Sequence, residues 1–577
     1  MVAARASRLL PALVGALLVV QAIVVIPAAT GGPQTGAAAT AADPTGSGLE
    51  LSGGVTKAEV GAPSKLTAHV GVGDADVDAR LPVPGSPATS PPATCGPGDR
   101  PETGLQGDVP LADQLSGRAA EGYSCGLQVV GYDPLGGRAS NANMAWAGHC
   151  AYVAGEGIAV IDVSDPTSPR QVSTLTTAGS IDAFESITAL EYGGRALLAA
   201  GRYGLFVDLQ LASNVPVDIY DVSDCAHPRL LSTFEFPSSV HNLTFSPDLT
   251  RLWSTLPLQA ADVADPTRPV YLGNLEAELR NGGVFHLEYA HEVAVSPEGS
   301  RLYIGGQVPV DEGSMTVDVT GWPARPATVV SAYAGPGHGI SRATIGGRSY
   351  LVRSEESVAF NALATGCLPE LLTPVAGPAH AFLTDITDEA HPVDAGAMQL
   401  EINRPEHCID QLLSGVNASS HYHDVDDPAD TTFVMVSTWN AGLRLWDVRD
   451  PAAPREVAYL NPGLFASTLF NTSTTPLDAA LNFSGARTGL DQAWGHVRYV
   501  KDTGQIWMST RLGGFWVLEL EPQLRAALDL PALPGHAPLS GSPRPPASRA
   551  LVPPSVLPAG LYCTIGSTRA LGTLPLR

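Results

Sequence analysis

The chain has 577 residues, of which 16% are charged and 44% are hydrophobic, and its formal net charge is −24. So acidic a surface repels phosphate backbones, which excludes nucleic acid as an expected partner. Glycine (60 residues) and proline (49 residues) are abundant, and this composition disfavours long helices and favours short strands joined by tight turns.

Residues 1–41 have the organisation of a secretory signal peptide. Arg5 and Arg8 form a short basic region, an apolar run follows over 9–26, and Ala-x-Ala cleavage candidates lie at 37–39 and 39–41. An uncleaved membrane anchor is the alternative, because the apolar run approaches the length that spans a bilayer. We expect cleavage, no transmembrane segment after it, and a chain that is secreted or associated with the cell envelope.

Three further segments follow from the composition. Residues 42–120 are rich in Gly, Pro and Ala and are expected to form an N-terminal arm, and residues 523–577 form a Pro-rich C-terminal tail. Residues 121–522 lie between them and contain a degenerate repeat. Each copy has an apolar strand, an acidic residue, a turn, a proline and a second short strand.

The repeat predicts two adjacent strands per copy. In IAVIDVSDPTSPRQVSTL, the alternation of Ala159 and Ile161 indicates a strand with one packed face, and Asp165-Pro166 ends it in a turn. Pro169 opens the next strand without an N–H donor, which is tolerated at a sheet edge. Seven copies are recognised by their acidic residue: Asp162, Asp221, Asp262, Asp318, Asp385, Asp447 and Glu519.

A hairpin precedes each acidic residue, best seen in HNLTFSPDLTRLWST and HEVAVSPEGSRLYIGG. A hairpin and two further strands make a four-stranded antiparallel unit, and seven such units bury their faces by closing a ring. We therefore predict an all-β fold, a seven-bladed β-propeller of four-stranded antiparallel blades. The strand-like stretch CGLQVVGYDPLGG, residues 125–137, is expected to close the ring against the last blade.

The strings AYVAGEGIAVIDVSDPTSP and LRLWDVRDPAAP resemble the LVIVD-repeat family of exported bacterial propellers. The similarity extends from about Cys125 to Pro522, and it is strongest in the first repeat. The resemblance implies the propeller fold and leaves the activity open.

Seven cysteines in an exported chain indicate disulfides and at least one free thiol. Proximity in sequence suggests that Cys95 pairs with Cys125, fastening the arm to the ring. Cys367 and Cys408 bracket the fifth repeat and form the second expected pair.

Histidines recur at one position of the repeat when the hairpins are aligned on their turns. This position begins the innermost strand, next to the channel of a propeller, so several imidazoles could hold a divalent Fe, Cu or Zn ion. A structural role for each histidine and a metal-free ligand or proton-transfer site are the alternatives. Glu185 takes the position in the second blade and Ala142 in the first, and the candidate metal ligands are His241, His291, His338, His423, His496 and Glu185.

His421 and His423 also lie in a short segment with Asp424, Asp426 and Asp427. A metal or acid–base role is conceivable there, but a solvated acidic turn is the favoured interpretation.

Two functions are compatible with these features. The first hypothesis is a scaffold at or outside the cell surface that binds a protein or a small molecule on its loop-lined face. The alternative is a metal-dependent enzyme, an oxidoreductase for example, whose histidine cluster lies at the mouth of the channel.

Overall fold

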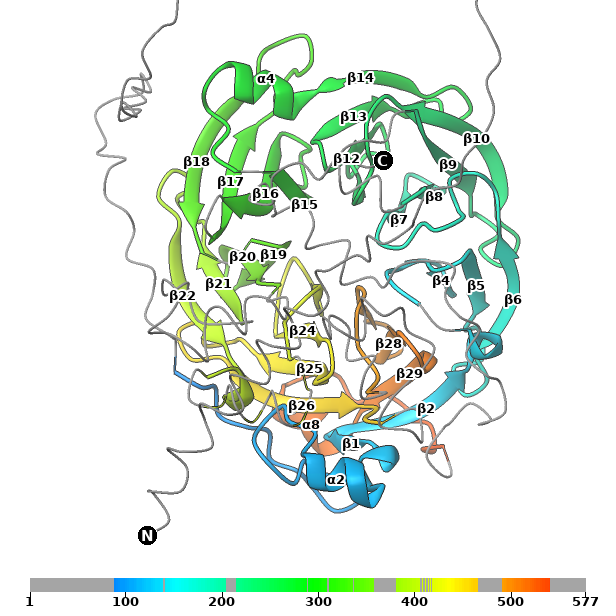
Figure 1. The fold of residues 1–577 in the computed structure, drawn as a ribbon, viewed down its shortest axis with the longest axis vertical. Helices are drawn as coiled ribbons and strands as arrows, with labels where there is room; N and C mark the ends of the chain where they lie inside the picture. Colours follow the sequence, from blue (N-terminus) through cyan, green and yellow to red (C-terminus); the bar gives the residue numbers. More distant parts are fainter. Residues whose placement is uncertain are drawn as a thin grey trace, which may run out of the picture. The chain divides into compact units, whose positions relative to one another are not determined.

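The computed structural model describes residues 88–539 except 139–140, 204–213, 288, 309–310, 336, 357–379, 405–406, 408–409, 411–413, 415, 417 and 465–489. Within these residues, seven antiparallel sheets form a ring, which confirms the predicted seven-bladed propeller (Figure 1). We number the blades in chain order, and the first strand of each lies innermost.

The first five blades are each built from four consecutive strands. Blades one and two contain β3 (Met144–Ala147), β4 (Cys150–Val153), β5 (Ile158–Asp162), β6 (Arg170–Leu175), β7 (Ile187–Tyr192), β8 (Arg195–Gly201), β9 (Val215–Asp221) and β10 (Arg229–Phe236). Blades three to five contain β11 (Leu243–Phe245), β12 (Arg251–Ser254), β13 (Gln259–Asp262), β14 (Val270–Asn274), β15 (Tyr289–Val295), β16 (Arg301–Val308), β17 (Asp311–Asp318), β18 (Thr328–Ala334), β19 (Gly339–Ile345), β20 (Arg348–Ser354), β21 (Ala381–Asp385) and β22 (Val393–Met398).

The last two blades each take a strand from the N-terminal side of the ring. β1 (Tyr123–Cys125) adds a fifth strand to blade six, beside β26, and β2 (Leu127–Asp133) pairs with β29 as the outermost strand of blade seven. The predicted closing strand is therefore confirmed. The remaining strands are β23 (His423–Val425), β24 (Phe433–Thr438), β25 (Gly442–Asp447), β26 (Arg455–Asn461), β27 (Arg498–Val500), β28 (Gln505–Thr510) and β29 (Gly514–Leu520).

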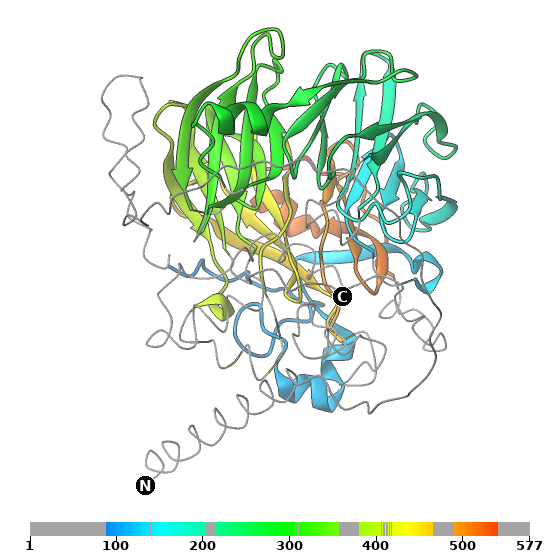
Figure 2. The ribbon, with the colours of Figure 1, turned by 45° about the horizontal axis from the view of Figure 1, so that its top comes forward.

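Helices are short and few in the described part of the chain, and none is long and apolar enough to cross a membrane. They are α2 (Leu111–Ser116), η1 (Arg118–Glu121), η2 (Leu135–Gly137), α4 (Leu275–Asn281), η4 (Glu401–Asn403) and α8 (Pro522–Ala527). The segment that carries α2 lies beside blades six and seven (Figures 1 and 2).

The seven acidic residues of the repeat all end the third strand of their blade or lie near its end. The turn that follows packs against the outermost strand of the preceding blade. Ser232 in β10 donates a hydrogen bond of 2.6 Å to the carbonyl of Pro266. A Cβ atom on Gly131 in β2 would lie only 1.9 Å from the carbonyl oxygen of Pro166. The repeated turn thus serves as a contact between blades.

A small residue lies at one position of every outermost strand, directly after a β-bulge. A Cβ atom on Gly396 would lie only 2.2 Å from the carbonyl oxygen of Pro451 in the neighbouring turn, as one on Gly131 would collide with Pro166. The seven residues at the position are Ser173, Ser232, Gly273, Ser331, Gly396, Ala458 and Gly131.

Replacing Gly131 with alanine is expected to lower the free energy of unfolding by about 1–3 kcal/mol, the usual cost of overpacking. The added methyl group would force β2 away from Pro166. Urea denaturation measures the change, with Gly282→Ala as the control. Gly282 has a φ of −74°, and a Cβ there meets no atom closer than 3.5 Å. Equal losses of stability in the two variants would contradict the prediction that the contact between Gly131 and Pro166 excludes a larger side chain.

The predicted disulfide between Cys95 and Cys125 is confirmed, with a Cα–Cα distance of 4.9 Å. It ties the arm to β1, as expected. The second predicted pair, Cys367 and Cys408, lies outside the described residues.

A disulfide that sequence reasoning missed joins Cys150 and Cys225, with a Cα–Cα distance of 5.6 Å. Cys150 begins β4 in blade one, and Cys225 lies in the turn after β9 in blade two. The covalent bond therefore reinforces the same kind of contact between blades as the Asp–Pro turns make.

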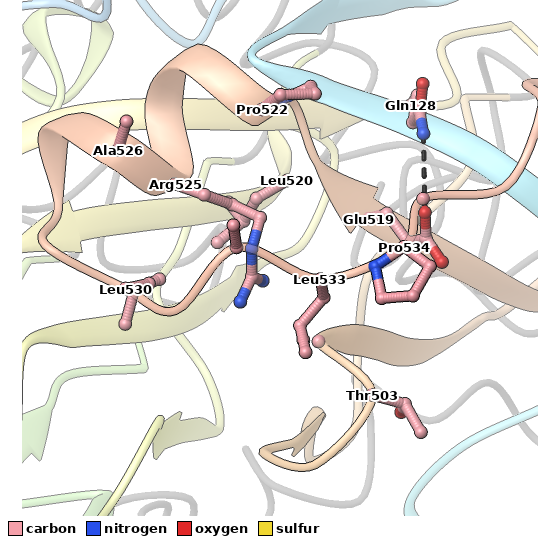
Figure 3. A pocket seen from close by; sticks show the side chains of 13 residues that line it. Gln128, Thr503, Glu519, Leu520, Pro522, Arg525, Ala526, Leu530, Leu533 and Pro534 are labelled. Atoms are coloured by element: carbon pink, nitrogen blue, oxygen red, sulfur yellow. Dashed lines mark hydrogen bonds between the residues drawn. The ribbon is translucent and has the colours of Figure 1, made fainter.

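The C-terminal segment after α8 folds back on blade seven, where His536 pairs with Glu519 at 2.6 Å. A cavity of about 110 Å³ lies between this C-terminal segment and blade seven, and its lining includes Arg525, Leu533 and Gln128 (Figure 3). Ligand pockets for drug-sized molecules are roughly 300–1,000 Å³, so this cavity is too small for such a ligand.

Candidate metal centre on the propeller axis

Four histidines and two glutamates from five blades meet at the centre of the ring. Each side chain is almost fully buried, and none of the six residues is more than 3% exposed. They are Glu185 of blade two, His241 of blade three, His291 of blade four, His338 and Glu356 of blade five, and His421 of blade six.

The first group consists of Glu185, His241 and His291. The two imidazole Nε2 atoms are 2.6 Å apart. The Glu185 Oε2 atom lies 3.1 Å from the Nε2 of His241 and 3.9 Å from that of His291. The ligand atoms of the three residues all lie within 4.8 Å of one another, so they could share one cation.

The second group consists of His338, Glu356 and His421, whose ligand atoms also lie within 4.8 Å of one another. Glu356 lies close to both rings, with its Oε2 at 3.2 Å from the Nε2 of His338 and its Oε1 at 3.5 Å from the Nε2 of His421. The groups are neighbours, because the Nε2 of His421 is also 3.5 Å from the Oε1 of Glu185.

Surrounding groups orient these ligands. The Nδ1 of His291 is 3.2 Å from the carbonyl oxygen of His338, and the Nδ1 of His421 is 2.7 Å from that of Trp494. A carbonyl only accepts, so each Nδ1 carries the proton, and in a neutral ring the Nε2 lone pair faces the cluster. Tyr422 and Trp494 donate to Glu185 at 2.9 Å and 3.0 Å.

The electrostatics keep the acids ionised and one imidazole neutral. Burial, together with the neighbouring His338 and His241, lowers the pKa of His291 well below its usual value. Burial alone would raise the pKa of Glu185, but the hydrogen bond with His241 and the charge of His421 hold it below its usual range. Ionised carboxylates and neutral imidazoles are the forms that bind metal ions.

The backbone defines which residues are equivalent between blades. The amide of His241 donates to the carbonyl of Thr255, that of His338 to Ser354 and that of His421 to Ser437, each at or next to the end of the second strand of its own blade. These three histidines therefore occupy one repeat position. Glu185 lies in the corresponding place in blade two, since the next residue, Ser186, accepts from the amide of Gly201 in β8.

The predicted equivalence is wrong for blades six and seven. In blade six the position belongs to His421, two residues before His423. Residues 426–432 separate β23 from β24, whereas only residues 246–250 separate β11 from β12. Because the turn of blade six is two residues longer, aligning the hairpins on their turns shifts this blade by two residues. The shift put His423 at the position that belongs to His421.

In blade seven the position belongs to Gly495 and not to His496. Ser437 Oγ donates to the carbonyl of Gly495 at 2.7 Å, just as Thr255 Oγ1 donates to that of His291 at 2.6 Å. The structure thus brings Glu185, His241, His291 and His338 together and places His423 and His496 outside both groups.

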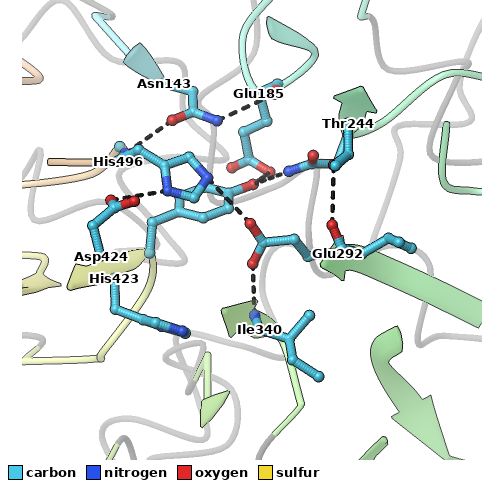
Figure 4. A network of polar contacts seen from close by, with 12 residues as sticks. Asn143, Glu185, Thr244, Glu292, Ile340, His423, Asp424 and His496 are labelled. Atoms are coloured by element: carbon cyan, nitrogen blue, oxygen red, sulfur yellow. Dashed lines mark hydrogen bonds and ion pairs between the residues drawn. The ribbon is translucent and has the colours of Figure 1, made fainter. Parts of the chain in front are cut away.

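His423 and His496 each have another environment. The Nε2 of His423 lies 2.9 Å from the carbonyl of Val352 in the adjacent blade, and burial lowers the pKa of this imidazole to about 4. His496 lies between two carboxylates, at 3.1 Å from Glu292 and 3.1 Å from Asp424 (Figure 4). Burial opposes its charge, but Asp424 and Glu292 raise the pKa of His496 to about 10.

Replacing His496 with glutamine is expected to cost about 2 kcal/mol of stability at pH 6, below the ~3–5 kcal/mol of a fully buried ion pair. The side chain is 21% exposed, so solvent screens part of the interaction. The pKa is raised in the folded state, so the ion pair contributes fully below about pH 6.5 and its contribution disappears towards pH 10. Urea denaturation of both proteins at pH 6, 8 and 10 measures the difference. A difference that stays constant with pH would contradict this prediction, and the exposed His149→Gln variant is the control.

Sequence reasoning missed two members of the cluster, His421 and Glu356. His421 was identified only within a segment interpreted as a solvated turn, yet it stands two residues before β23, as His241 stands two residues before β11. That spacing from the strand was the available signal. No repeat pattern marks Glu356, which lies two residues after the end of β20 and reaches the cluster through the ring geometry.

A family match in blade one supports the fold. The family model of the LVIVD repeat matches residues 137–177, which contain all four strands of blade one, β3 to β6. No curated protein matches the sequence. An ancestral GH74 enzyme is similar in structure at 11% identity and a TM-score of 0.40, over 66% of this chain and 47% of that chain, so the match spans less than half of its length. Sqt1 from Chaetomium thermophilum matches at 11% identity and a TM-score of 0.40, over 68% of this chain and 97% of that chain. The chain is thus a seven-bladed β-propeller with an LVIVD repeat in its first blade.

Proposed function

We propose that this propeller is a metal-dependent oxidoreductase that binds a divalent first-row transition metal among Glu185, His241, His291, His338, Glu356 and His421. One observation carries the proposal. Four imidazoles and two carboxylates from five blades converge in a buried space. Imidazole nitrogens and carboxylate oxygens are ligands of first-row transition metals, and their convergence from separate blades offers such an ion several of them at once.

The donor set favours iron, copper or zinc over magnesium or calcium, because imidazole suits these metals and the other two prefer oxygen ligands. Two histidines and one carboxylate leave coordination positions open on an iron ion, which is the arrangement of many non-haem oxygenases. The tyrosine and tryptophan that donate to Glu185 would hold that ligand in place when a metal is bound.

Metal analysis of the purified, untagged protein tests the binding step. We expect tightly bound iron, copper or zinc that survives dialysis, and its loss in a folded His291→Ala variant. The exposed His227→Ala variant, whose side chain is 81% exposed, is the matched control and should retain the metal. Wild-type protein that holds no more metal than His291→Ala, even after incubation with each of the three ions, would defeat the proposal.

A binding scaffold is the second candidate, and the burial of the cluster favours it. Because no ligand residue is more than 3% exposed, an ion at this position could brace the five blades and leave binding to the loop-lined face. The partner would then be a protein or a small molecule recognised by those loops.

Nitric oxide separates the two candidates, because it occupies an open position on ferrous iron and produces a characteristic electron paramagnetic resonance signal. We expect this signal from iron-loaded wild-type protein if the centre reacts with small molecules. A loaded centre that gives no signal would support the scaffold and an ion with a structural role.

We also propose that the protein works outside the cytoplasm, as a secreted or envelope-associated bacterial protein. Its disulfides are compatible with an oxidising compartment. In this proposal residues 1–41 are a cleaved signal peptide, 42–120 an arm, 121–522 the propeller and 523–577 a tail. Mass determination of the mature protein from its native host would test the cleavage.

A further inference from the structure

We propose that the axial centre holds two metal ions, one in each group of two histidines and one glutamate. This inference rests on the proposed function, because it specifies the number of ions at the same site. The first ion would be bound by Glu185, His241 and His291, and the second by His338, Glu356 and His421.

The spacing of the imidazole rings is the observation that divides the cluster into two groups of ligands. A ring bound through Nε2 has its centre about 3.2 Å from the ion, given a metal–nitrogen bond of about 2.0–2.1 Å. Two such rings at a right angle around one ion have centres about 4.5 Å apart. Smaller separations require an angle narrower than octahedral or tetrahedral coordination allows.

The rings within each group lie close to this separation, and His291 and His338, which belong to different groups, lie well below it. The centres of His241 and His291 are 4.3 Å apart, and those of His338 and His421 are 4.7 Å apart. The centres of His291 and His338 are only 3.6 Å apart. His291 and His338 therefore pack against each other as ligands of neighbouring ions and not of one ion.

The carboxylates are consistent with the same division, with one contact shared between the groups. Glu185 lies 3.1 Å from His241 and 3.9 Å from His291, and Glu356 contacts both histidines of the second group. His421 lies 3.5 Å from each carboxylate, so it adjoins both groups. In this arrangement each ion would receive one carboxylate and two imidazoles.

Titration of chelator-treated protein with Co²⁺ alone tests the inference. Metal analysis after gel filtration counts the ions, and visible absorption follows their binding. We expect two ions per wild-type chain and exchange coupling between them in electron paramagnetic resonance spectra. His241→Ala should remove the first ion, Glu356→Gln should remove the second, and each variant should retain one uncoupled ion. His423→Gln, a buried histidine in neither group, should retain both.

The outcomes separate the two proposals. Wild-type protein that binds no cobalt would defeat the metal proposal itself. One ion per wild-type chain would leave that proposal standing and overturn the two-ion centre. The division between groups would also be overturned if both folded variants kept two ions or if both lost all cobalt. Circular dichroism shows whether each variant is folded. If a variant is not folded, the number of cobalt ions and the spectrum of the wild-type protein still decide between one ion and two.

Discussion

Replacing Arg444 with methionine is expected to lower the free energy of unfolding by about 3–5 kcal/mol, the usual cost of breaking a buried ion pair from one side. The guanidinium pairs with Glu456 at 3.0 Å and with Glu102 of the N-terminal arm. The side chains of Arg444 and Glu456 are fully buried, and that of Glu102 is 7% exposed. Methionine would leave two buried carboxylates without their counter-charge.

The position of Glu102 makes this ion pair a buried polar link between the arm and blade six. Gln106 also reaches Glu456, at 2.8 Å, so the arm and the blade share one buried network. Urea denaturation followed by tryptophan fluorescence measures the loss. Arg348→Met is the control, because Arg348 pairs with Asp385 while 60% exposed, and such surface pairs contribute about 0–1 kcal/mol.

A second comparison shows whether the lost charge is responsible. Adding Glu102→Gln to Arg444→Met should restore part of the stability, since it removes one of the unpaired carboxylates. If Arg444→Met costs no more than Arg348→Met, the arm is not anchored through this network.

Removing the disulfide between Cys150 and Cys225, with alanine at both positions, is expected to cost about 4 kcal/mol. The two cysteines are 75 residues apart in sequence. A crosslink across so long a segment removes much of the conformational freedom of the unfolded chain. The bond also joins blade one to blade two.

The redox state provides the control for this prediction. Under non-reducing conditions the double variant should unfold at a lower urea concentration than the wild type. With a reductant that opens both disulfides, the two proteins should unfold at nearly the same concentration. A difference that persists after reduction would show that packing of the sulfur atoms, and not the crosslink, accounts for the effect.

Most of the fold could be predicted because its signals are local. The acidic residue and the turn after it, as in Asp162 and Asp165-Pro166, recur with each blade and mark the third and fourth strands. A further signal was present but not recognised: the small residue after the bulge, such as Gly131, Ser232 or Gly396. It reflects the contact between adjacent blades, so its meaning depends on knowing that the blades adjoin.

The candidate site could be predicted only in part. Glu185, His241, His291 and His338 were found because they share a repeat position. His421 was missed because the longer turn of blade six shifts the alignment, and Glu356 has no counterpart in the repeat. Both residues are far in sequence from most of the other ligands, and local sequence patterns do not show that they lie together.

By itself, the sequence determined the all-β class, the seven blades, the strand that closes the ring and the pairing of Cys95 with Cys125. Each of these depends on strand periodicity, turn chemistry or proximity along the chain. Only the tertiary structure decided which histidines face one another, that Glu356 joins them and that His496 pairs with Glu292 and Asp424 instead. The physical reason is that closing a ring brings together residues more than two hundred positions apart, such as Glu185 and His421, at distances set by the packing of all seven blades.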